Sequence, residues 1–310
     1  MEAWHLLASV KTGRGHVKQG IPCQDKVRCC KRHGVSVAAL ADGAGSAVNS
    51  HFGAEFVTEA ICAYISSNFN ALYNQADGIE AKKQITDYLH AGLHDLSGRM
   101  GVETASLAST LLVVAVQEER YIVIHIGDGV IGYWRDDRVI PATVPQSGEF
   151  TNSTVFITEP DAWRFMQILK GSLGSVKGFV LMSDGAAASL YSRQKKCFAL
   201  AAYSLMCQAA FLGEAFAGRI LQQGLLPELA AMTMDDCSVA MLVKGSTGKI
   251  SKQARHRYEA IIAALQAGFS WEESCRMAGI RKKYYRRYAY GLGQAGLLRR
   301  QKAAFDGSCR

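Results

Sequence analysis

The sequence has no apolar stretch long enough to cross a membrane. Its most apolar run, residues 107–116, contains Ser109 and Thr110 and is about half as long as the ~20 residues that a spanning helix needs. The N-terminus, MEAWHLLASVKTGRGH, also lacks the basic start and apolar core of a secretion signal. We therefore expect a cytoplasmic protein with no membrane partner.

The sequence also lacks a CxxC pair, an internal repeat and any low-complexity tract. Its nine cysteines are odd in number, and Cys29 and Cys30 are adjacent, which argues against a disulfide framework or a thiolate zinc site. We expect reduced, mostly buried thiols. The rest of the composition, 49% hydrophobic and 20% charged over 310 residues, is that of one large globular domain with a small appendage.

The net charge of +8 is unevenly distributed along the chain. Residues 1–251 contain 22 Lys and Arg against 23 Asp and Glu, whereas residues 252–310 contain 13 against 4. The basic character therefore belongs to the last 59 residues, and this asymmetry indicates two modules with different partners.

Short apolar runs predict strands, and the segments between them have apolar residues at the spacing of a helix. The predicted strands are Val35–Leu40, Thr110–Val116, Ile122–Ile126, Phe179–Ser183 and Ser238–Val243. Helices are expected around residues 56–65, 80–96 and 197–222. Because strands come in groups rather than in βαβ alternation, we predict an α+β fold with antiparallel sheets. We divide the chain into a domain over residues 1–243, a linker over 244–254 and a basic helical domain over 255–310.

An apolar strand that ends in Asp-Gly occurs three times, at Asp42-Gly43, Asp128-Gly129 and Asp184-Gly185. Asp-Gly is often a hairpin turn, and Asp128-Gly129 fits that alternative because Ile131–Trp134 could be its return strand. Asp42 and Asp184 are instead followed by small residues that lead into a helix. Asp77-Gly78 has no preceding strand and is interpreted as a turn.

Two further acidic positions adjoin these strands: Asp235-Asp236 precedes the last one, and Asp25 ends the segment GIPCQD. Carboxylates at the ends of neighbouring strands converge and repel one another, and a divalent cation relieves that repulsion. All-oxygen coordination favours Mg²⁺ or Mn²⁺ over zinc, and a pair of such ions can clamp a phosphoryl group. The pattern therefore predicts a metal centre for phosphoryl chemistry.

The order of these motifs resembles the metal-dependent protein phosphatase 2C family, and most closely its bacterial branch. The motifs are GIPCQDK (20–26), ADGAGSA (41–47), AST (108–110), GDG (127–129), SDG (183–185) and DDCS (235–238). The resemblance covers residues 5–243 and implies a sandwich of two antiparallel β-sheets flanked by helices, followed here by a small all-α C-terminal domain.

The resemblance also implies roles for single residues. Asp42 would bridge two metal ions and the Gly43 carbonyl would contact one of them. Asp184 and Asp235 would bind the first ion, Asp25 would support the second, and Asp128 with Asp184 would form a third, weaker site. The implied reaction is direct hydrolysis by a metal-bridging water without a phosphorylated enzyme. Ser109 and Thr110 match a strand motif and are given no chemical role.

Three features depart from the family pattern. Gln24 stands where many members have a Glu ligand, and Ala44 stands where some have a His proposed as general acid. The Arg that holds the substrate phosphate is also missing from its usual place, which leaves Arg14, His16 and Lys18 as alternatives. These departures keep open a second hypothesis, a catalytically degenerate fold that acts as a phosphoprotein-binding or DNA-associated regulatory protein.

The basic tail predicts three short helices, near 256–267, after Ser270 as N-cap, and from Arg281 past Tyr290. The turn between the second and third resembles a helix-turn-helix. Residues that would contact DNA or an acidic protein partner are Arg281, Lys282, Lys283, Arg286 and Arg287.

The leading hypothesis is a protein phosphatase that removes phosphate from Ser and Thr with Mn²⁺ or Mg²⁺. Its substrates would be phosphorylated proteins, and a Ser/Thr kinase would oppose it. The complete set Asp25, Asp42, Asp184 and Asp235 favours an enzyme over a binding protein.

Overall fold

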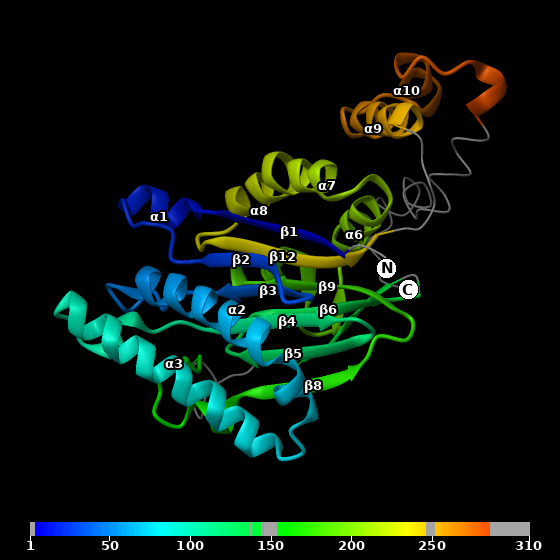
Figure 1. Cartoon of the computed structure of the whole chain (residues 1–310). Coiled ribbons are helices and arrows are strands. Elements are labelled where there is room, and N and C mark those ends of the chain that lie inside the picture. Colours follow the sequence, from blue (N-terminus) through cyan, green and yellow to red (C-terminus); the bar gives the residue numbers. More distant parts are fainter. Residues whose placement is uncertain (1–3, 137, 144, 146–153, 246–251, 286–310) are drawn as a thin grey trace.

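The computed structural model describes residues 4–136, 138–143, 145, 154–245 and 252–285. Its strands form two five-stranded antiparallel sheets and a small hairpin (Figure 1). The first sheet has the order β1 (Trp4–Lys11), β12 (Cys237–Lys244), β9 (Val176–Met182), β6 (Val130–Arg135), β7 (Arg138–Pro141). The second has the order β2 (Lys26–Arg32), β3 (Val35–Ala41), β4 (Leu111–Gln117), β5 (Arg120–Ile126), β8 (Gln167–Ser172).

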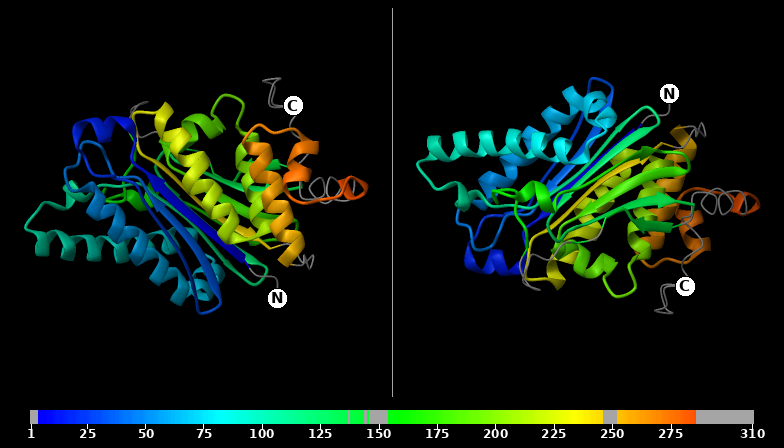
Figure 2. Two further views of the ribbon diagram at one scale, coloured as in Figure 1. Left: turned by 90° about the horizontal axis from the view of Figure 1, so that it is seen from above. Right: turned by 90° about the horizontal axis from the view of Figure 1, so that it is seen from below.

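The two sheets pack face to face through a fully apolar core. Leu40 and Val114 from one sheet and Phe179, Leu181 and Leu242 from the other belong to one buried cluster. The alternation of side chains along each strand sends the other half of the apolar residues to the outer faces of the sheets, where helices cover them. The architecture is therefore four layers, helix–sheet–sheet–helix (Figures 1 and 2).

Helices α2 (Ser50–Asn74) and α3 (Gly78–Met100) cover the outer face of the second sheet. A short 3₁₀ helix (Thr104–Leu107) and α4 (Ala162–Phe165) lie on the same side of the molecule. The outer face of the first sheet is covered by α5 (Asp184–Leu190), α6 (Leu200–Leu212), α7 (Glu214–Ile220) and α8 (Leu226–Met232), with a π-helical turn (Leu221–Leu225) between the last two. The short α1 (Arg14–Gln19) follows β1.

The predicted fold class is confirmed, and each of the five predicted strands is present with slightly different ends. The predicted helix over 197–222 is wrong in detail, because residues 197–198 form β11 and the helix breaks at Gly213, whose φ is +93°. Asp77 is not a simple turn residue: its Oδ1 accepts hydrogen bonds from the N–H groups of Ile79 and Glu80 and caps α3.

The hairpin expected at Asp128-Gly129 is also absent. β5, which precedes this turn, belongs to the second sheet, whereas β6 pairs with β7 and β9 in the first. The turn therefore carries the chain from one sheet to the other. Asp128 is left at the end of the sandwich instead of at the tip of a two-stranded ribbon.

The C-terminal part of the described chain packs on the first-sheet side of the molecule. Helices α9 (Lys252–Gln266) and α10 (Trp271–Met277) share an apolar cluster with α6 and α7 that includes Leu212, Phe216 and Ile261, and a 3₁₀ turn (Lys282–Tyr284) follows them. The predicted cap is present, since Ser270 and Glu273 form a reciprocal capping box. The domain boundaries at 243 and 255 stay a prediction. In the part of the chain that the structure describes, no helix combines the length and apolarity needed to cross a membrane.

Candidate metal centre

Strand register brings the five predicted carboxylates to one end of the sandwich. Lys26 pairs with Ala41, so Asp25 and Asp42, one residue beyond each, lie side by side. Met182 pairs with Val239, which places Asp184 beside the Asp235-Asp236 segment. Asp128 follows β5, whose last residue Ile126 pairs with Leu111 at the same end of the second sheet.

Two glycines permit this close packing. A Cβ atom at Gly185 would lie 2.1 Å from the backbone oxygen of Asp236, and one at Gly13 would lie 2.0 Å from that of Asp235. The glycine of the Asp184-Gly185 motif therefore serves close backbone approach. It does not serve a hairpin turn.

Asp25 and Asp42 lie beside each other, and Asp25 is the buried member of the pair. Asp25 is 1% exposed, and burial raises its pKa to about 7, although the nearby Ser238 and Ser183 hydroxyls act in the opposite direction. The pKa of Asp42 lies well above its ordinary value because of burial and the negative charges of Asp25, Asp184 and Asp235. Burial and the charge of Asp235 likewise raise the pKa of Asp184.

The donor set fits a hard divalent cation. Both carboxylate oxygens of Asp25 and Oδ1 of Asp184 are buried without a hydrogen-bond partner. Among the ion pairs of the described residues, none joins a Lys or Arg to any of the five predicted carboxylates. Clustered, unpaired carboxylates of this kind are stabilised by a cation that takes all-oxygen ligands.

The ligands are gathered as adjacent pairs, Asp42 with Asp25 and Asp42 with Asp184. Over the described ranges, no three His, Cys, Asp or Glu side chains already surround a single point where an ion would sit. Asp42 and Asp184 are partly exposed and Asp235 is exposed, so the centre is open to solvent on that side. Gly43 is buried directly beside Asp42.

Asp128 lies next to this group but is held by other contacts. Its charge is one of the causes that raise the pKa of Asp184, after burial and the charge of Asp235. Its Oδ2 accepts a hydrogen bond of 2.9 Å from the hydroxyl of Thr154. The buried His125 holds the turn at residues 127–129 in place. Its Nε2 lies 2.9 Å from the Gly127 carbonyl and its Nδ1 lies 2.5 Å from the Thr143 hydroxyl. A carbonyl only accepts, so Nε2 carries the proton.

Asp236 is the residue that sequence reasoning left without a role. It is 1% exposed and accepts hydrogen bonds from the backbone N–H groups of Gly13 at 2.8 Å and Gln24 at 2.6 Å. Nδ1 of His16 lies 3.0 Å from its Oδ1. Asp236 therefore ties the N-terminal loop that leads to Asp25 to the start of β12. The adjacent Asp235 and Asp236 look alike in the sequence, and no pattern separates the exposed carboxylate from the buried one.

From the sequence, Thr110 was also given no chemical role. In the structure it forms two hydrogen bonds with the backbone of Asp42, which we call the Thr110 clamp. Its hydroxyl accepts a hydrogen bond from the Asp42 N–H at 2.9 Å, and its own N–H donates to the Asp42 carbonyl at 2.8 Å. A Cβ atom at Gly127 would lie 2.5 Å from the Thr110 methyl group. Thr110 thus braces two of the Asp-Gly turns at once.

The three candidates for the substrate phosphate lie on α1, whose Gly15 N–H donates a hydrogen bond to the carbonyl of Met234, the neighbour of Asp235. Arg14 and Lys18 are exposed, and Nε of Arg14 contacts the Met234 sulfur at 3.2 Å. His16 is partly buried and turned toward Asp236. Gln24 is buried, and Ala44 is held by a backbone hydrogen bond to Ala108.

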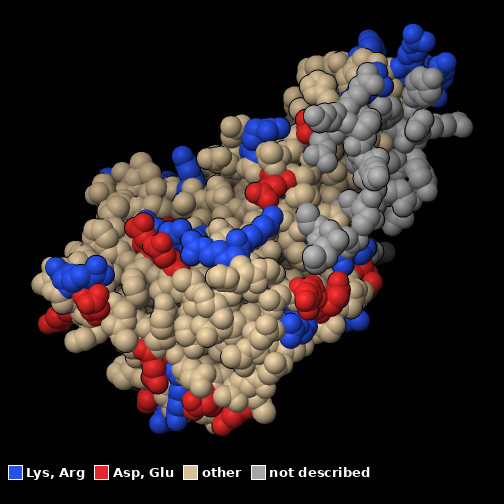
Figure 3. Space-filling model, in the orientation of Figure 1, with Lys and Arg blue, Asp and Glu red and all other residues tan. Residues whose placement is uncertain are grey.

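The basic C-terminal candidates lie far from this centre in the fold. Arg281, Lys282 and Lys283 are exposed at the end of the molecule formed by the C-terminal helices, where Figure 3 shows Lys and Arg side chains gathered. Only a 3₁₀ turn is seen at the start of the predicted third helix. Arg286 and Arg287 lie outside the described residues.

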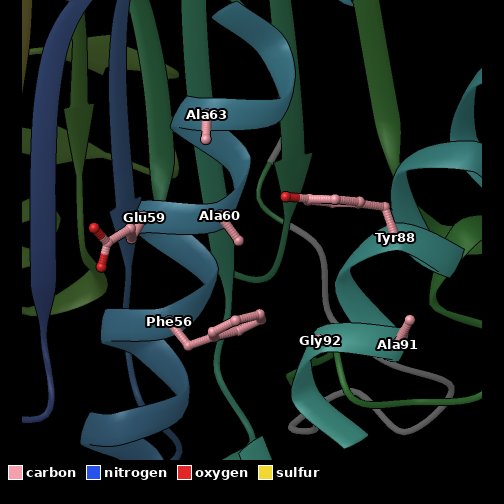
Figure 4. Close-up of a pocket in the computed structure, with 7 residues that line it drawn as sticks. All are labelled: Phe56, Glu59, Ala60, Ala63, Tyr88, Ala91 and Gly92. Atoms are coloured by element: carbon pink, nitrogen blue, oxygen red, sulfur yellow. The ribbon is translucent and has the colours of Figure 1, made fainter. Parts of the chain in front are cut away.

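A separate apolar pocket of about 500 Å³ lies between α2 and α3. Phe56 and Tyr88 point into it from the two helices, and Gly92 forms part of its wall (Figure 4). The carboxylates of the metal centre do not line this pocket. We give it no role in the chemistry.

A family model described as Protein phosphatase 2C matches residues 12–216, which is more than half of the chain. The chain belongs to the protein phosphatase 2C family. The matched range includes four of the five predicted carboxylate ligands of this phosphatase 2C domain, and Asp235 lies outside it.

A curated relative is Serine/threonine-protein phosphatase 3 of Escherichia coli (strain K12), with 25% identity over 166 residues. The match covers 52% of this phosphatase 2C family member and 65% of the relative, so the chain spans just under two thirds of that protein.

Solved structures with the same fold include the Mycobacterium tuberculosis serine/threonine phosphatase PstP/Ppp, at 15% identity and a TM-score of 0.55. That likeness covers 78% of this chain and 99% of the other. The catalytic domain of PstP in complex with two manganese ions has 18% identity and a TM-score of 0.52, over 79% of this chain and all of the other. At these identities the likeness establishes the phosphatase 2C fold.

Proposed function

We propose that this protein hydrolyses phosphoserine and phosphothreonine in proteins, using Mn²⁺ or Mg²⁺. The observation that carries the proposal is the cluster of Asp42 with the buried Asp25 and the partly buried Asp184, none of them paired with a Lys or Arg among the described residues, at the end of a phosphatase 2C fold. A kinase that phosphorylates Ser or Thr would supply its substrates.

Each of the predicted ligands would bind a particular ion. Asp42 lies between the others and would bridge two ions, with the Gly43 carbonyl on one of them. Asp184 and Asp235 would hold the first ion and Asp25 the second, while Asp128 with Asp184 would hold a third more weakly. When bound, the ions would supply a nucleophilic water at neutral pH and neutralise charge on the phosphoryl oxygens.

The protein's own contribution is rigidity and charge. Asp236 and Thr110 fix the backbone beside Asp25 and at Asp42, so that the ligands do not reorganise during the reaction. Arg14 and Lys18 are exposed on α1, Arg14 contacts Met234 beside Asp235, and we infer that these two cations would contact the substrate phosphate. The contact of His16 with Asp236 makes His16 better suited to positioning than to binding phosphate directly.

The alternative is a degenerate phosphatase that binds phosphoproteins without cleaving them, because Gln24 and Ala44 replace common family residues. The test is release of phosphate from a phosphoserine peptide by the full chain with Mn²⁺, with Mg²⁺ and with a chelator. Metal-dependent release that Asp42→Asn abolishes supports the enzyme. Tight peptide binding without release supports the alternative.

The control for this test is Asp87→Asn, which removes an exposed carboxylate from α3. It should leave phosphate release unchanged, because Asp87 has no contact with the centre.

The C-terminal helices are proposed as a docking element for DNA or an acidic protein, supported by the exposed Arg281, Lys282 and Lys283. Because these helices share an apolar cluster with α6 and α7, the test uses the full chain. Binding of a DNA duplex that weakens steeply with salt, and that Lys282→Ala with Lys283→Ala reduces, would favour DNA. Undiminished binding in that variant would contradict this role.

A further inference from the structure

A basic hairpin stands beside the metal centre and has no part in the proposed chemistry. β10 (Tyr191–Ser192) and β11 (Cys197–Phe198) pair with each other, and the turn between them carries Arg193, Lys195 and Lys196. All three cations are exposed, and none takes part in an ion pair among the residues that the structure describes. Three exposed cations within four residues form a local positive potential that attracts an anionic ligand.

The hairpin is anchored at both its base and its turn. Phe198 is buried in the apolar cluster on the outer face of the first sheet, and its ring packs at a tilt against Tyr191, with 5.0 Å between the ring centroids. The Ser192 hydroxyl accepts a hydrogen bond from the Lys195 N–H at 3.2 Å, and Lys196 has a left-handed φ of +50°. The charges are therefore presented on a defined turn.

The hairpin also has a fixed relation to the carboxylates. Nη2 of Arg193 donates to the backbone carbonyl of Asp128 at 3.4 Å. The hairpin begins directly after α5, a seven-residue helix that starts at Asp184 and is about 10 Å long. Arg193 thus ties the turn to Asp128, whereas Arg14 contacts Met234, the neighbour of Asp235. Both of these aspartates are close enough to Asp184 to raise its pKa.

We propose that the 191–198 hairpin recognises acidic residues that flank the phosphorylated residue of the protein substrate. This inference rests on the proposed function, since it names the substrate class of the same site. The turn follows the seven-residue α5, which starts at Asp184, and is tied to Asp128 through Arg193, so the acidic residues that it selects lie within a few positions of the phosphoserine. Arg193 orients the turn through Asp128, and Lys195 and Lys196 contact the acidic side chains.

The experiment compares kcat/KM for two phosphoserine peptides that have Glu or Gln at the second to fourth positions on both sides of the phosphoserine. The full chain should prefer the Glu peptide by about fivefold at low salt, and added salt should reduce this preference. In the double variant Lys195→Ala, Lys196→Ala the ratio should fall to about one. Arg193 is left unchanged because it contacts Asp128.

The matched control is Lys31→Ala with Arg32→Ala. It removes the same charge from two exposed residues at the far end of β2, about 20 Å from Asp25. The control should keep the full preference for the Glu peptide. Equal loss of preference in both variants would reduce the effect to net charge and contradict the proposal.

Three other outcomes distinguish failure of the hairpin proposal from failure of the proposed phosphatase function. If the unsubstituted protein releases phosphate but does not distinguish the peptides, the hairpin proposal is wrong and the proposed function stands. If it hydrolyses neither peptide with Mn²⁺, the proposed function fails and this proposal fails with it. If the hairpin variant loses affinity for a DNA duplex with no change in peptide ratio, the hairpin serves nucleic acid and the proposal is wrong.

Discussion

Oδ2 of Asp236 accepts a hydrogen bond of 2.6 Å from the backbone N–H of Gln24. Each of these residues adjoins a predicted metal ligand, because Gln24 precedes Asp25 and Asp236 follows Asp235. The bond therefore holds the backbone next to Asp25 against the residue next to Asp235, so that these two predicted ligands come together at one site. It also explains why a buried carboxylate stands next to an exposed one.

Substituting Asp236 should weaken the metal centre without removing a ligand. Asn has one acceptor oxygen, so Asp236→Asn leaves the buried N–H of Gly13 or Gln24 facing an amide NH₂ group. We expect a loss of about 1–3 kcal/mol in unfolding free energy. We also expect about 10–100-fold weaker Mn²⁺ binding, as is common when a residue that supports a ligand is changed.

Urea unfolding and calorimetric titration with Mn²⁺ measure the two effects of Asp236→Asn. Asp87→Asn on α3 is the control and should match the unsubstituted protein in both measurements. Identical Mn²⁺ affinity in Asp236→Asn and the control would show that Asp236 does not position the centre.

Thr110 offers a sharper test, because Val and Ser divide its properties. Thr110→Val keeps the shape but removes the acceptor for the Asp42 N–H, and should cost about 1–3 kcal/mol of stability and lower phosphate release. Thr110→Ser keeps the hydroxyl and should retain most of the activity at a smaller cost. Chemical denaturation and kcat with Mn²⁺ check this order. A Val variant as active as the Ser variant would contradict the clamp.

The carboxylates should make the effect of metal on stability depend on pH. The pKa of Asp25 rises from 3.8 to about 7 in the folded protein, and that of Asp42 also rises, so the folded state holds protons that the unfolded chain releases. The contribution of these groups to unfolding free energy is therefore present at low pH and is lost as pH rises from about 4 to 7. Bound Mn²⁺ should reverse this loss.

The measurement is the difference in melting temperature with Mn²⁺ and with a chelator between pH 5 and 7.5. The difference should grow with pH. The buried His125, whose pKa burial lowers to about 4, acts in the opposite direction but contributes equally to both curves. A difference that stays constant or shrinks with rising pH would count against the carboxylates as the metal site.

The C-terminal helices should depend on α7 for their stability. Phe216 is 6% exposed on α7 and belongs to the same apolar cluster as the buried Ile261 of α9. Phe216→Ala should cost about 3–5 kcal/mol locally and speed amide hydrogen exchange throughout α9. Met277→Ala, at an exposed position on α10, is the control. Unchanged exchange in α9 would show that the helices fold on their own.

The sequence predicted best the features that depend on complete burial. Strands such as β3 and β4 are apolar on both faces, because one face meets the other sheet and the opposite face meets helices. Their ends carry the Asp-Gly pairs, and antiparallel pairing then forces the carboxylates together. The pattern and the fold thus share one physical cause.

The edge strands, the β10–β11 hairpin and the long-range contacts of Asp236 could not be predicted from the sequence. β2 and β8 are edge strands with few buried side chains, so their residues lack the apolar run that marks a strand. The β10–β11 hairpin was missed because Phe198 continues the apolar spacing of α6. The role of Asp236 depends on three partners between 212 and 223 residues away along the chain, which no local pattern reports.

The most direct test of the central claim is calorimetric titration of the full chain and of Asp42→Asn with Mn²⁺, each followed by phosphate release from a phosphoserine peptide. We predict that the unsubstituted protein binds two ions and releases phosphate only when they are bound. Asp42→Asn, which removes the carboxylate that we propose to bridge the ions, should lose both the binding and the reaction. Equal Mn²⁺ binding and equal phosphate release by the two proteins would contradict the account.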